Sequence, residues 1–163
     1  MIGCETNNSI LGNTQGFGLF VVSGTSDRYV VTGNNFTGNA AGSVSDAGTG
    51  TNKKISGNVG YVVPAIAPSF LSSWVNFGSL YTNAGYWKDA DGMVHLTGLV
   101  KSGTVGQPIF QLPAGYRPAT QQVFAAISNG AIAQVDVATH GDVLATTGNL
   151  ANFALSGILF RAA

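Results

Sequence analysis

The sequence predicts an all-β protein in which turns of a parallel β-helix precede an antiparallel β-sandwich. Only 9% of its 163 residues are charged, against roughly 25% in an average soluble domain, and its one glutamate is Glu5. Helical bundles and coiled coils need many Glu, Lys and Arg residues on their solvent-exposed faces, so this composition excludes both. The chain has 23 glycines among many Asn, Ser, Thr and Val residues, a mixture that favours tight turns and strands.

Residues 1–60 contain a repeat whose period is typical of a solenoid. The three copies are Ile10-Leu11-Gly12-Asn13, Val31-Thr32-Gly33-Asn34 and Ile55-Ser56-Gly57-Asn58, and their glycines are 21 and 24 residues apart. Strands are expected at 16–22, 28–32 and 35–37, joined by Gly and Asn corners into turns of a parallel β-helix. Asn suits these corners because it tolerates left-handed backbone angles and can hydrogen-bond to an Asn one rung away.

Three copies of the repeat form only a short stub, so we expect the chain to be the end of a longer protein. The alternative for this part is a generic loop region rich in Gly and Asn. Residues 40–51 contain few apolar side chains and are expected to form a loop inserted between rungs.

Residues 61–76 are expected to form a linker or interface segment, because Pro64 and Pro68 block a helix and favour extended backbone. Four apolar and aromatic residues near its end should be buried: Phe70, Leu71, Trp74 and Phe77. A β-helix ends in a rung of unpaired backbone groups, and this segment is expected to cover that end together with the sandwich.

Residues 77–163 show hairpin signals separated by glycine turns, as an antiparallel sandwich does. Turns are expected at Asp89-Ala90-Asp91-Gly92, at Asn129-Gly130 and at His140-Gly141-Asp142, with flanking strands at 86–88, 93–100, 123–128, 131–137 and 143–145. Residues 153–160 are expected to form the closing strand. Alternation along the strands predicts that six side chains face inward: Val94, Leu96, Val135, Val137, Leu155 and Leu159.

Two segments of this second half lack a polar face. Residues 123–127 and the region around 158–160 are apolar at both alternating positions, whereas a strand of a free-standing sandwich keeps one face polar. Because few charges are available, we expect identical neighbours around a three-fold axis to cover these strands, giving a homotrimer.

Residues 16–39 (GFGLFVVSGTSDRYVVTGNNFTGN) resemble a coil of the right-handed β-helix of bacteriophage tailspikes and related pectin-lyase-like proteins. The second half resembles the jelly-roll-like C-terminal sandwich of many phage tail fibres and spikes. The segments that carry this second resemblance are Tyr86-Trp87-Lys88-Asp89, Gly92-Met93-Val94-His95-Leu96-Thr97-Gly98, Leu112-Pro113-Ala114-Gly115-Tyr116-Arg117-Pro118-Ala119 and Leu155-Ser156-Gly157-Ile158-Leu159-Phe160-Arg161. Such spikes are homotrimers that bind, and often cleave, a bacterial surface polysaccharide.

The resemblance implies a C-terminal fragment of a tailspike, located in the phage tail of the virion. Its expected function is to trimerise the spike, to cap the β-helix and to contact host capsule or lipopolysaccharide. The alternative is part of a polysaccharide depolymerase, a glycosidase or a lyase, whose catalytic body is mostly absent from this chain. A bacterial adhesin tip is a third reading, but it should lack the Leu-Pro-Ala-Gly-Tyr-Arg-Pro segment.

A depolymerase site would need paired carboxylates, one acting as the general acid and one ionised. The seven acidic residues are Glu5, Asp27, Asp46, Asp89, Asp91, Asp136 and Asp142. They offer no clustered pair on successive rungs, so no catalytic residue is expected, although Glu5 and Asp27 would be the first candidates. Asp89 and Asp91 flank a turn, where Asp forms local backbone hydrogen bonds.

Metals, cofactors, nucleic acid and membrane insertion are not expected. His95 and His140 are far apart in sequence and lack the spacing of a zinc site, and no Glu follows Asp89-x-Asp91-Gly92 as a calcium loop requires. Seven basic residues balance seven acidic ones, which leaves no basic surface for nucleic acid. No apolar run approaches the roughly 18 residues of a membrane helix.

Sugar binding uses exposed aromatic rings that stack on sugar faces. The candidate rings lie beside the predicted turns: Tyr81, Tyr86, Trp87 and Tyr116. Packing in the core or at a subunit interface explains each of them at least as well.

Overall fold

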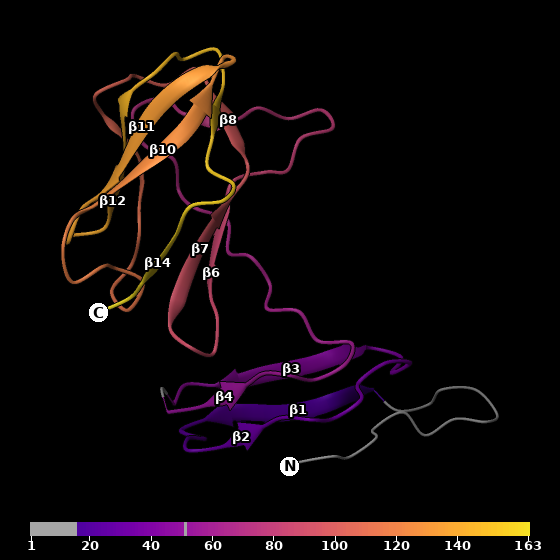
Figure 1. Ribbon diagram of the computed structural model, residues 1–163. Coiled ribbons are helices and arrows are strands. Elements are labelled where there is room, and N and C mark those ends of the chain that lie inside the picture. Colours follow the sequence, from indigo (N-terminus) through magenta and orange to yellow (C-terminus); the bar gives the residue numbers. More distant parts are fainter. Residues whose placement is uncertain (1–15, 51) are drawn as a thin grey trace. The chain divides into compact units, whose positions relative to one another are not determined.

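A computed structural model describes residues 16–50 and 52–163. The chain is divided at Val62/Val63 into two units, and only the described residues of each are considered below. All regular elements of the described residues are β-strands, and none of these residues is helical (Figure 1). The all-β class is therefore confirmed. The described part of the chain accordingly contains no helix long and apolar enough to cross a membrane.

The first unit stacks two successive turns of the chain in parallel. Its strands are β1 (Phe17–Gly24), β2 (Val30–Val31), β3 (Gly42–Gly48) and β4 (Lys54–Ile55). β1 pairs with β3 and β2 pairs with β4, both in parallel, and Asn35 forms a parallel bridge to Val59. Partners are 24 or 25 residues apart, as in Phe17 opposite Gly42 and Val30 opposite Lys54. This offset agrees with the longer of the two spacings between the Gly-Asn copies.

The prediction of a loop at residues 40–51 is wrong, because β3 occupies most of this segment. The segment is a strand because β1 supplies parallel backbone partners along its length, with Leu19 opposite Val44. Its conformation is therefore determined by backbone pairing with the preceding turn. The composition of the segment itself does not indicate that pairing. The strand expected at 35–37 is shorter than predicted, since only Asn35 forms a bridge and Thr37 already lies in a turn.

The corner asparagines of the two turns are buried and contact each other directly, as the repeat predicted. Asn58 Oδ1 accepts hydrogen bonds from Asn34 Nδ2 (2.9 Å) and from the Asn34 backbone N–H (3.0 Å). Each Asn follows a glycine in the left-handed region, Gly33 with φ of 69° and Gly57 with φ of 62°, a conformation that favours glycine. The first copy of the repeat, 10–13, lies outside the described residues.

The second unit consists of antiparallel sheets around one buried core. Its strands are β5 (Val75–Asn76), β6 (Gly85–Lys88), β7 (Met93–Thr97), β8 (Leu99–Lys101), β9 (Pro108–Gln111), β10 (Gln122–Ser128), β11 (Ala131–Val137), β12 (Asp142–Thr147), β13 (Phe153–Ala154) and β14 (Leu159–Arg161). They form three sheets with the orders β10-β11-β12-β9, β13-β8-β5 and β14-β7-β6. All pairings within these sheets are antiparallel.

The predicted hairpin turns are confirmed, but the single strand expected at 93–100 is wrong: it is divided at Gly98, which has φ of 101°, into β7 and β8, and these belong to different sheets. β6 pairs with β7 across the Asp-Gly turn, and β10 pairs with β11 across Asn129-Gly130, whose φ angles of 48° and 79° fit a type I′ turn. The single closing strand at 153–160 is wrong. It is divided into β13, which pairs with β8, and β14, which pairs with β7, because the chain turns at Ser156-Gly157, where Gly157 has φ of 93°.

Five of the six residues predicted to face inward are buried in this core: Val94, Leu96, Val135, Val137 and Leu155. Leu159 is 47% exposed, so its inward orientation is wrong, and its neighbours Ile158 and Phe160 are buried instead. The turn between β13 and β14 resets the alternation, so Leu155 and Leu159 no longer share a face.

The segment 63–76, expected as part of a linker, belongs to the second unit. Ile66 forms a bridge to Tyr86 and Phe70 forms one to Phe110. Trp74, 1% exposed, packs edge-to-face on Phe153 with ring centroids 5.9 Å apart. Trp74, expected as part of a cover for the rungs, is therefore a core residue of the second unit. The expected burial of Leu71 is wrong, because its side chain is 42% exposed.

Candidate functional site

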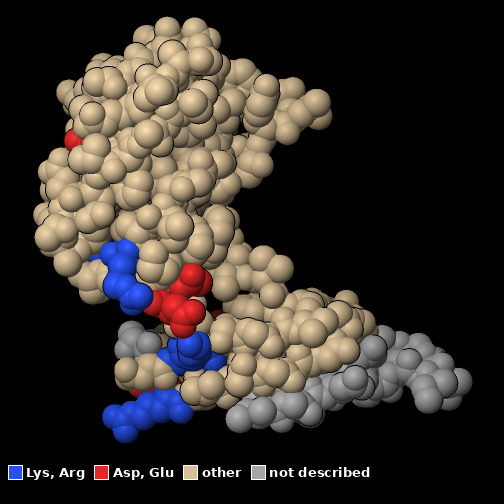
Figure 2. All heavy atoms as spheres, viewed as in Figure 1, with Lys and Arg blue, Asp and Glu red and all other residues tan. Residues whose placement is uncertain are grey.

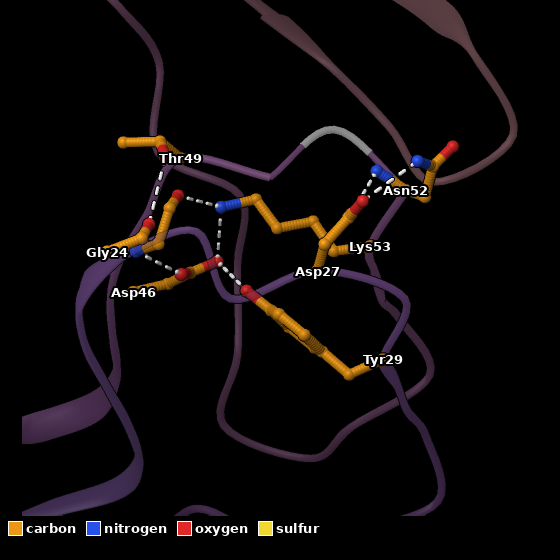
Figure 3. Close-up of polar contacts among 8 residues, drawn as sticks. Gly24, Asp27, Tyr29, Asp46, Thr49, Asn52 and Lys53 are labelled. Atoms are coloured by element: carbon orange, nitrogen blue, oxygen red, sulfur yellow. Dashed lines mark hydrogen bonds and ion pairs between the residues drawn. The ribbon is translucent and has the colours of Figure 1, made fainter.

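A polar cluster centred on Asp46 joins the two turns of the first unit (Figure 3). Asp46 Oδ2 accepts a hydrogen bond from the Tyr29 hydroxyl (2.7 Å) and lies 3.0 Å from Lys53 Nζ. Asp46 Oδ1 accepts the backbone N–H of Gly48 (3.0 Å), and Lys53 Nζ also donates to the Gly48 carbonyl (2.5 Å). One carboxylate thus connects β3 to the segments before β2 and β4.

Two groups of this cluster, Asp46 and Tyr29, have pKa values shifted by their surroundings. Burial alone would raise the pKa of Asp46, but hydrogen bonds from Tyr29, Lys53 and the Gly48 N–H outweigh it and hold the pKa below its usual value. Burial and the hydrogen bond to Asp46 raise the pKa of Tyr29 to about 12. Neither group has a pKa near 7, which a general acid or base at neutral pH requires. The geometry therefore fits a structural contact.

Asp27 forms the neighbouring contact between the turns. Its two carboxylate oxygens accept hydrogen bonds from Asn52, one from the backbone N–H (2.7 Å) and one from the side-chain amide (2.9 Å). The side-chain bond from Asn52 is the main cause that lowers the pKa of Asp27. Glu5, the other acid singled out for a depolymerase site, lies outside the described residues.

Three of the predicted sugar-binding rings pack against other aromatic side chains of the second unit. Tyr86 is 7% exposed in the core, and its ring meets the Tyr116 ring edge-on at 5.2 Å. Tyr116 is half-buried, with Lys88 Nζ 5.3 Å from its ring centroid. Tyr81 is 57% exposed and packs edge-to-face on Phe77 at 4.9 Å. Tyr86 and Tyr116 are thus brought together, and the buried Tyr86 ring offers no face to a sugar.

Trp87 lies on the opposite side of β6 from Tyr86, in what we call the aromatic row: Trp87, His95 and Leu159. Trp87 is the strand partner of His95, and His95 is the strand partner of Leu159. The Trp87 and His95 rings are stacked at 4.9 Å with 4° between their planes. The row therefore presents partly exposed apolar and aromatic groups on three adjacent strands.

Asp89 holds the imidazole of this row. Its Oδ2 lies 3.0 Å from His95 Nε2, while its Oδ1 accepts the backbone N–H groups of Asp91 and Met93, each at 2.9 Å. The hydrogen bond with His95 is the main cause that lowers the pKa of Asp89. Alternation predicted that His95 points outward, but neither its stacking on Trp87 nor its contact with Asp89 was anticipated.

An apolar surface covers one side of β10 and β11, and we call it the β10–β11 face: Val123, Ala125, Ile127 and Ile132. Val123 is 62% exposed, Ile127 54% and Ile132 84%. Ile127 and Ile132 are strand partners, and β10 forms the edge of its sheet. A shallow groove runs over this face, lined by Val123, Phe124, Ala125, Ile132, Ala133, Gln134 and Thr147.

The β10–β11 face carries almost no charge. No Lys, Arg, Asp or Glu lines the groove. The surface over β10 and β11 that faces the viewer in Figure 2 is likewise free of charged residues. Asp136, the strand partner of Val123, is 8% exposed and accepts hydrogen bonds from Gln121 Nε2 (3.2 Å) and Gln134 Nε2 (2.7 Å). Its carboxylate is thus withdrawn from the surface.

The sequence indicated this face only in part. The apolar residues at both alternating positions of 123–127 predicted that β10 needs cover on a second side, and Val123, Ala125 and Ile127 are the exposed residues of this segment. Ile132, the most exposed of them, was not singled out. Its position three residues after Asn129, opposite Ile127 across a two-residue turn, was the available signal.

No metal site appears in the described part of the chain, where no three His, Cys, Asp or Glu side chains gather in a way that could hold an ion. Comparison with protein-family models, with curated proteins and with solved structures finds no match to this chain.

Proposed function

We propose that this chain is the C-terminal module of a bacteriophage tailspike and that it holds three identical chains together at the end of a right-handed parallel β-helix. The observation that carries the proposal is the exposed, uncharged β10–β11 face. Large contiguous apolar patches on a soluble protein mark interaction sites. On a strand that also forms a sheet edge, such a patch needs a partner to avoid aggregation.

The order of the two units supports this assignment. Parallel turns with an offset of 24 or 25 residues precede a unit of antiparallel sheets around its own core, as in the spikes that the sequence resembles. In this proposal the first unit supplies the last coils of the β-helix. The second unit is the jelly-roll-like sandwich, and the assembled spike belongs to the phage tail of the virion.

The low charge of the chain is consistent with a three-fold assembly. Like charges that meet around a symmetry axis repel one another, whereas neutral apolar surfaces gain about 25 cal/mol for each Å² removed from water. An obligate interface of this kind buries roughly 2,000 Å² or more per pair of chains. The chain itself is not catalytic in this proposal, because Asp27 and Asp46 are committed to contacts between turns.

Sedimentation of the purified chain at micromolar concentration tests the proposal. We expect one species with three times the mass of the chain and no folded monomer, because dissociation would expose the β10–β11 face. A folded monomer at that concentration would contradict the trimer and the module's role with it. Far-UV circular dichroism of the same sample, with a β spectrum, is the control for folding.

Binding of host capsule or lipopolysaccharide is a second proposed function, and the aromatic row favours it. Trp87 is a half-buried ring with an imidazole stacked on it and a carboxylate nearby, which combines a stacking surface with hydrogen-bonding groups. We expect the chain to bind purified bacterial polysaccharide in surface plasmon resonance. Trp87→Ala should weaken that binding by at least about tenfold. Tyr86→Phe, a change inside the core, is the control and should leave the affinity unchanged.

A further inference from the structure

The groove on the β10–β11 face needs a protruding partner if the assembly has three-fold symmetry. In a cyclic trimer each contact is heterologous: one surface of a chain meets a different surface of the next chain. A groove that contacts its own copy would instead produce a two-fold dimer. The chain should therefore carry, elsewhere on the second unit, an apolar protrusion that fits a shallow and uncharged groove.

The turn between β5 and β6 provides such a protrusion. All residues from 79 to 83 are exposed, and this segment projects away from the sheets in Figure 1. Leu80, which belongs to this segment, is 100% exposed. A fully exposed leucine contributes no hydrophobic burial to the stability of the isolated chain. Burial against a partner would remove its whole apolar surface from water.

This turn is held in place at both of its ends, so the position of Leu80 is preorganised. The Phe77 N–H donates to the Leu99 carbonyl (2.8 Å), and the Leu99 N–H donates to the Thr82 carbonyl (3.0 Å). The Phe77 ring packs on Tyr81 and lies 4.9 Å from Lys101 Nζ. A preorganised contact loses less conformational entropy on binding.

The turn also contains backbone strain. Ser79, directly before Leu80, has φ of 59°, a left-handed conformation that residues with a Cβ rarely adopt. The hydrogen bond from the Tyr81 N–H to the Gly78 carbonyl (3.3 Å) closes the turn around it. Strained turns that persist in a structure often present a functional side chain, and here the presented side chain is Leu80.

We propose that Leu80 of one chain packs into the β10–β11 groove of the next chain, against Val123 and Ile132, and that three such contacts close the trimer. This inference rests on the proposed trimer and names the two surfaces that form it. Ala125, whose side chain is small, lies among the residues that line the groove. No charged group lines the groove, so the contact would not bury a charged side chain of the groove without a partner.

Cysteine cross-linking tests the contact. In a Cys4→Ser background, which removes the one native cysteine, the double variant Leu80→Cys/Ile132→Cys is oxidised and separated without reductant. We expect covalent species of two and three chains and nothing larger, because the ring closes. Each single variant should give no covalent trimer. Leu150→Cys/Ile132→Cys, built on another exposed leucine (55%), is the matched control and should not cross-link.

The outcomes separate this inference from the proposed function. A trimer in sedimentation without cross-links in the double variant overturns the Leu80 contact and leaves the trimer standing. A monomer overturns both. Covalent species longer than three chains overturn the closed ring, since they show an open heterologous assembly.

A second set of variants tests the same contact without oxidation. Leu80→Asp should weaken association by about 10- to 100-fold for each contact, because it removes a buried leucine and adds a charge. Leu150→Asp should leave association unchanged. Combining Leu80→Asp with Ile132→Lys should restore part of the loss, and equal weakening by Leu80→Asp and Leu150→Asp would overturn the assignment. The far-UV spectrum checks that each variant folds.

Discussion

Asp46 shows how a single side chain can connect two turns of the chain. Its carboxylate meets a hydroxyl, an ammonium group and a backbone N–H, which come from the residue before β2, the residue before β4 and the end of β3. Burial disfavours the charge, and these donors restore it. Such a group contributes to stability only while it is ionised, so its effect should depend on pH.

We expect Asp46→Asn to lower the stability of the first unit by about 1–2 kcal/mol at pH 6, because hydrogen bonds to a charged acceptor are lost. The folded pKa lies below the unfolded value near 3.8. The contribution is therefore complete above that value and disappears as the pH falls through the folded pKa. Amide hydrogen exchange of β3 at pH 6 and pH 3 measures it, and the variant should lose most of the wild-type difference. Tyr29→Phe, which keeps the carboxylate, should be intermediate.

Gly103 illustrates a residue that only packing explains. A Cβ at this position would overlap the ring of Trp74, which is itself buried against Phe153. We expect Gly103→Ala to destabilise the second unit by about 3 kcal/mol, since neither ring can move away without opening the core. Thermal unfolding followed by tryptophan fluorescence measures the loss. Gly106→Ala has open space around its Cβ and should cost only about 1 kcal/mol for its positive φ; equal losses would contradict the packing argument.

At the scale of elements, the sequence predicted those features that residues adjacent in the chain determine. Asn129-Gly130 predicted a hairpin because both residues accept positive φ, and the Gly-Asn corners predicted the contact between Asn34 and Asn58. β3 could not be predicted in this way, because its strand conformation depends on a partner 25 residues earlier in the chain. Leu159 was misplaced because one turn at Ser156-Gly157 changes which face every later residue occupies.

The candidate sites show the same division between local and long-range signals. The exposed apolar side chains of β10 could be predicted, because residues 123–127 are apolar at both alternating positions. Tyr86 and Trp87 are adjacent in sequence, and alternation places them on opposite sides of β6, but only the packing shows that Tyr86 faces the core. The cluster around Asp46 joins residues from two turns of the chain, so no local pattern marks it.

The contact between Asn34 and Asn58 leads to a prediction for the repeated Gly-Asn corners. In Asn58→Ala, the buried Asn34 N–H loses its acceptor, and the Val31 and Ser56 carbonyls lose the amide that donates to them at 2.9 and 3.1 Å. The Asn58 side chain forms four such hydrogen bonds in all, each worth about 0.5–1.5 kcal/mol, so we expect a loss of about 3 kcal/mol. Hydrogen exchange of β2 and β4 measures it. Asn52→Ala removes an exposed contact and should cost less than about 1 kcal/mol; a similar loss would contradict the role of burial.

At the scale of the whole molecule, the two units differ in how they are stabilised. The second unit has a core of large side chains, among them Trp74, Phe110 and Phe153, all with relative exposures of 1% or less. In the described part of the first unit the buried apolar residues are Val31 and Phe36, joined by the polar Asn34 and Asn58. Phe20, Val22 and Val30 are each more than half exposed there. The first unit therefore depends more on contacts outside itself.

This difference predicts that residues 63–163 fold without the first unit and that residues 1–62 do not fold alone. Burial of large apolar side chains contributes roughly 1.5–3 kcal/mol each, and one unit has many while the other has few. Circular dichroism and thermal melting of the two separate fragments test this directly. We expect fragment 63–163 to melt cooperatively, with the tryptophan fluorescence change of the full chain, since both tryptophans lie in it. Fragment 1–62 should show no cooperative transition. A cooperative melt of fragment 1–62 would mean that stacked turns and corner asparagines suffice, and that the exposed apolar residues of β1 and β2 need no further cover.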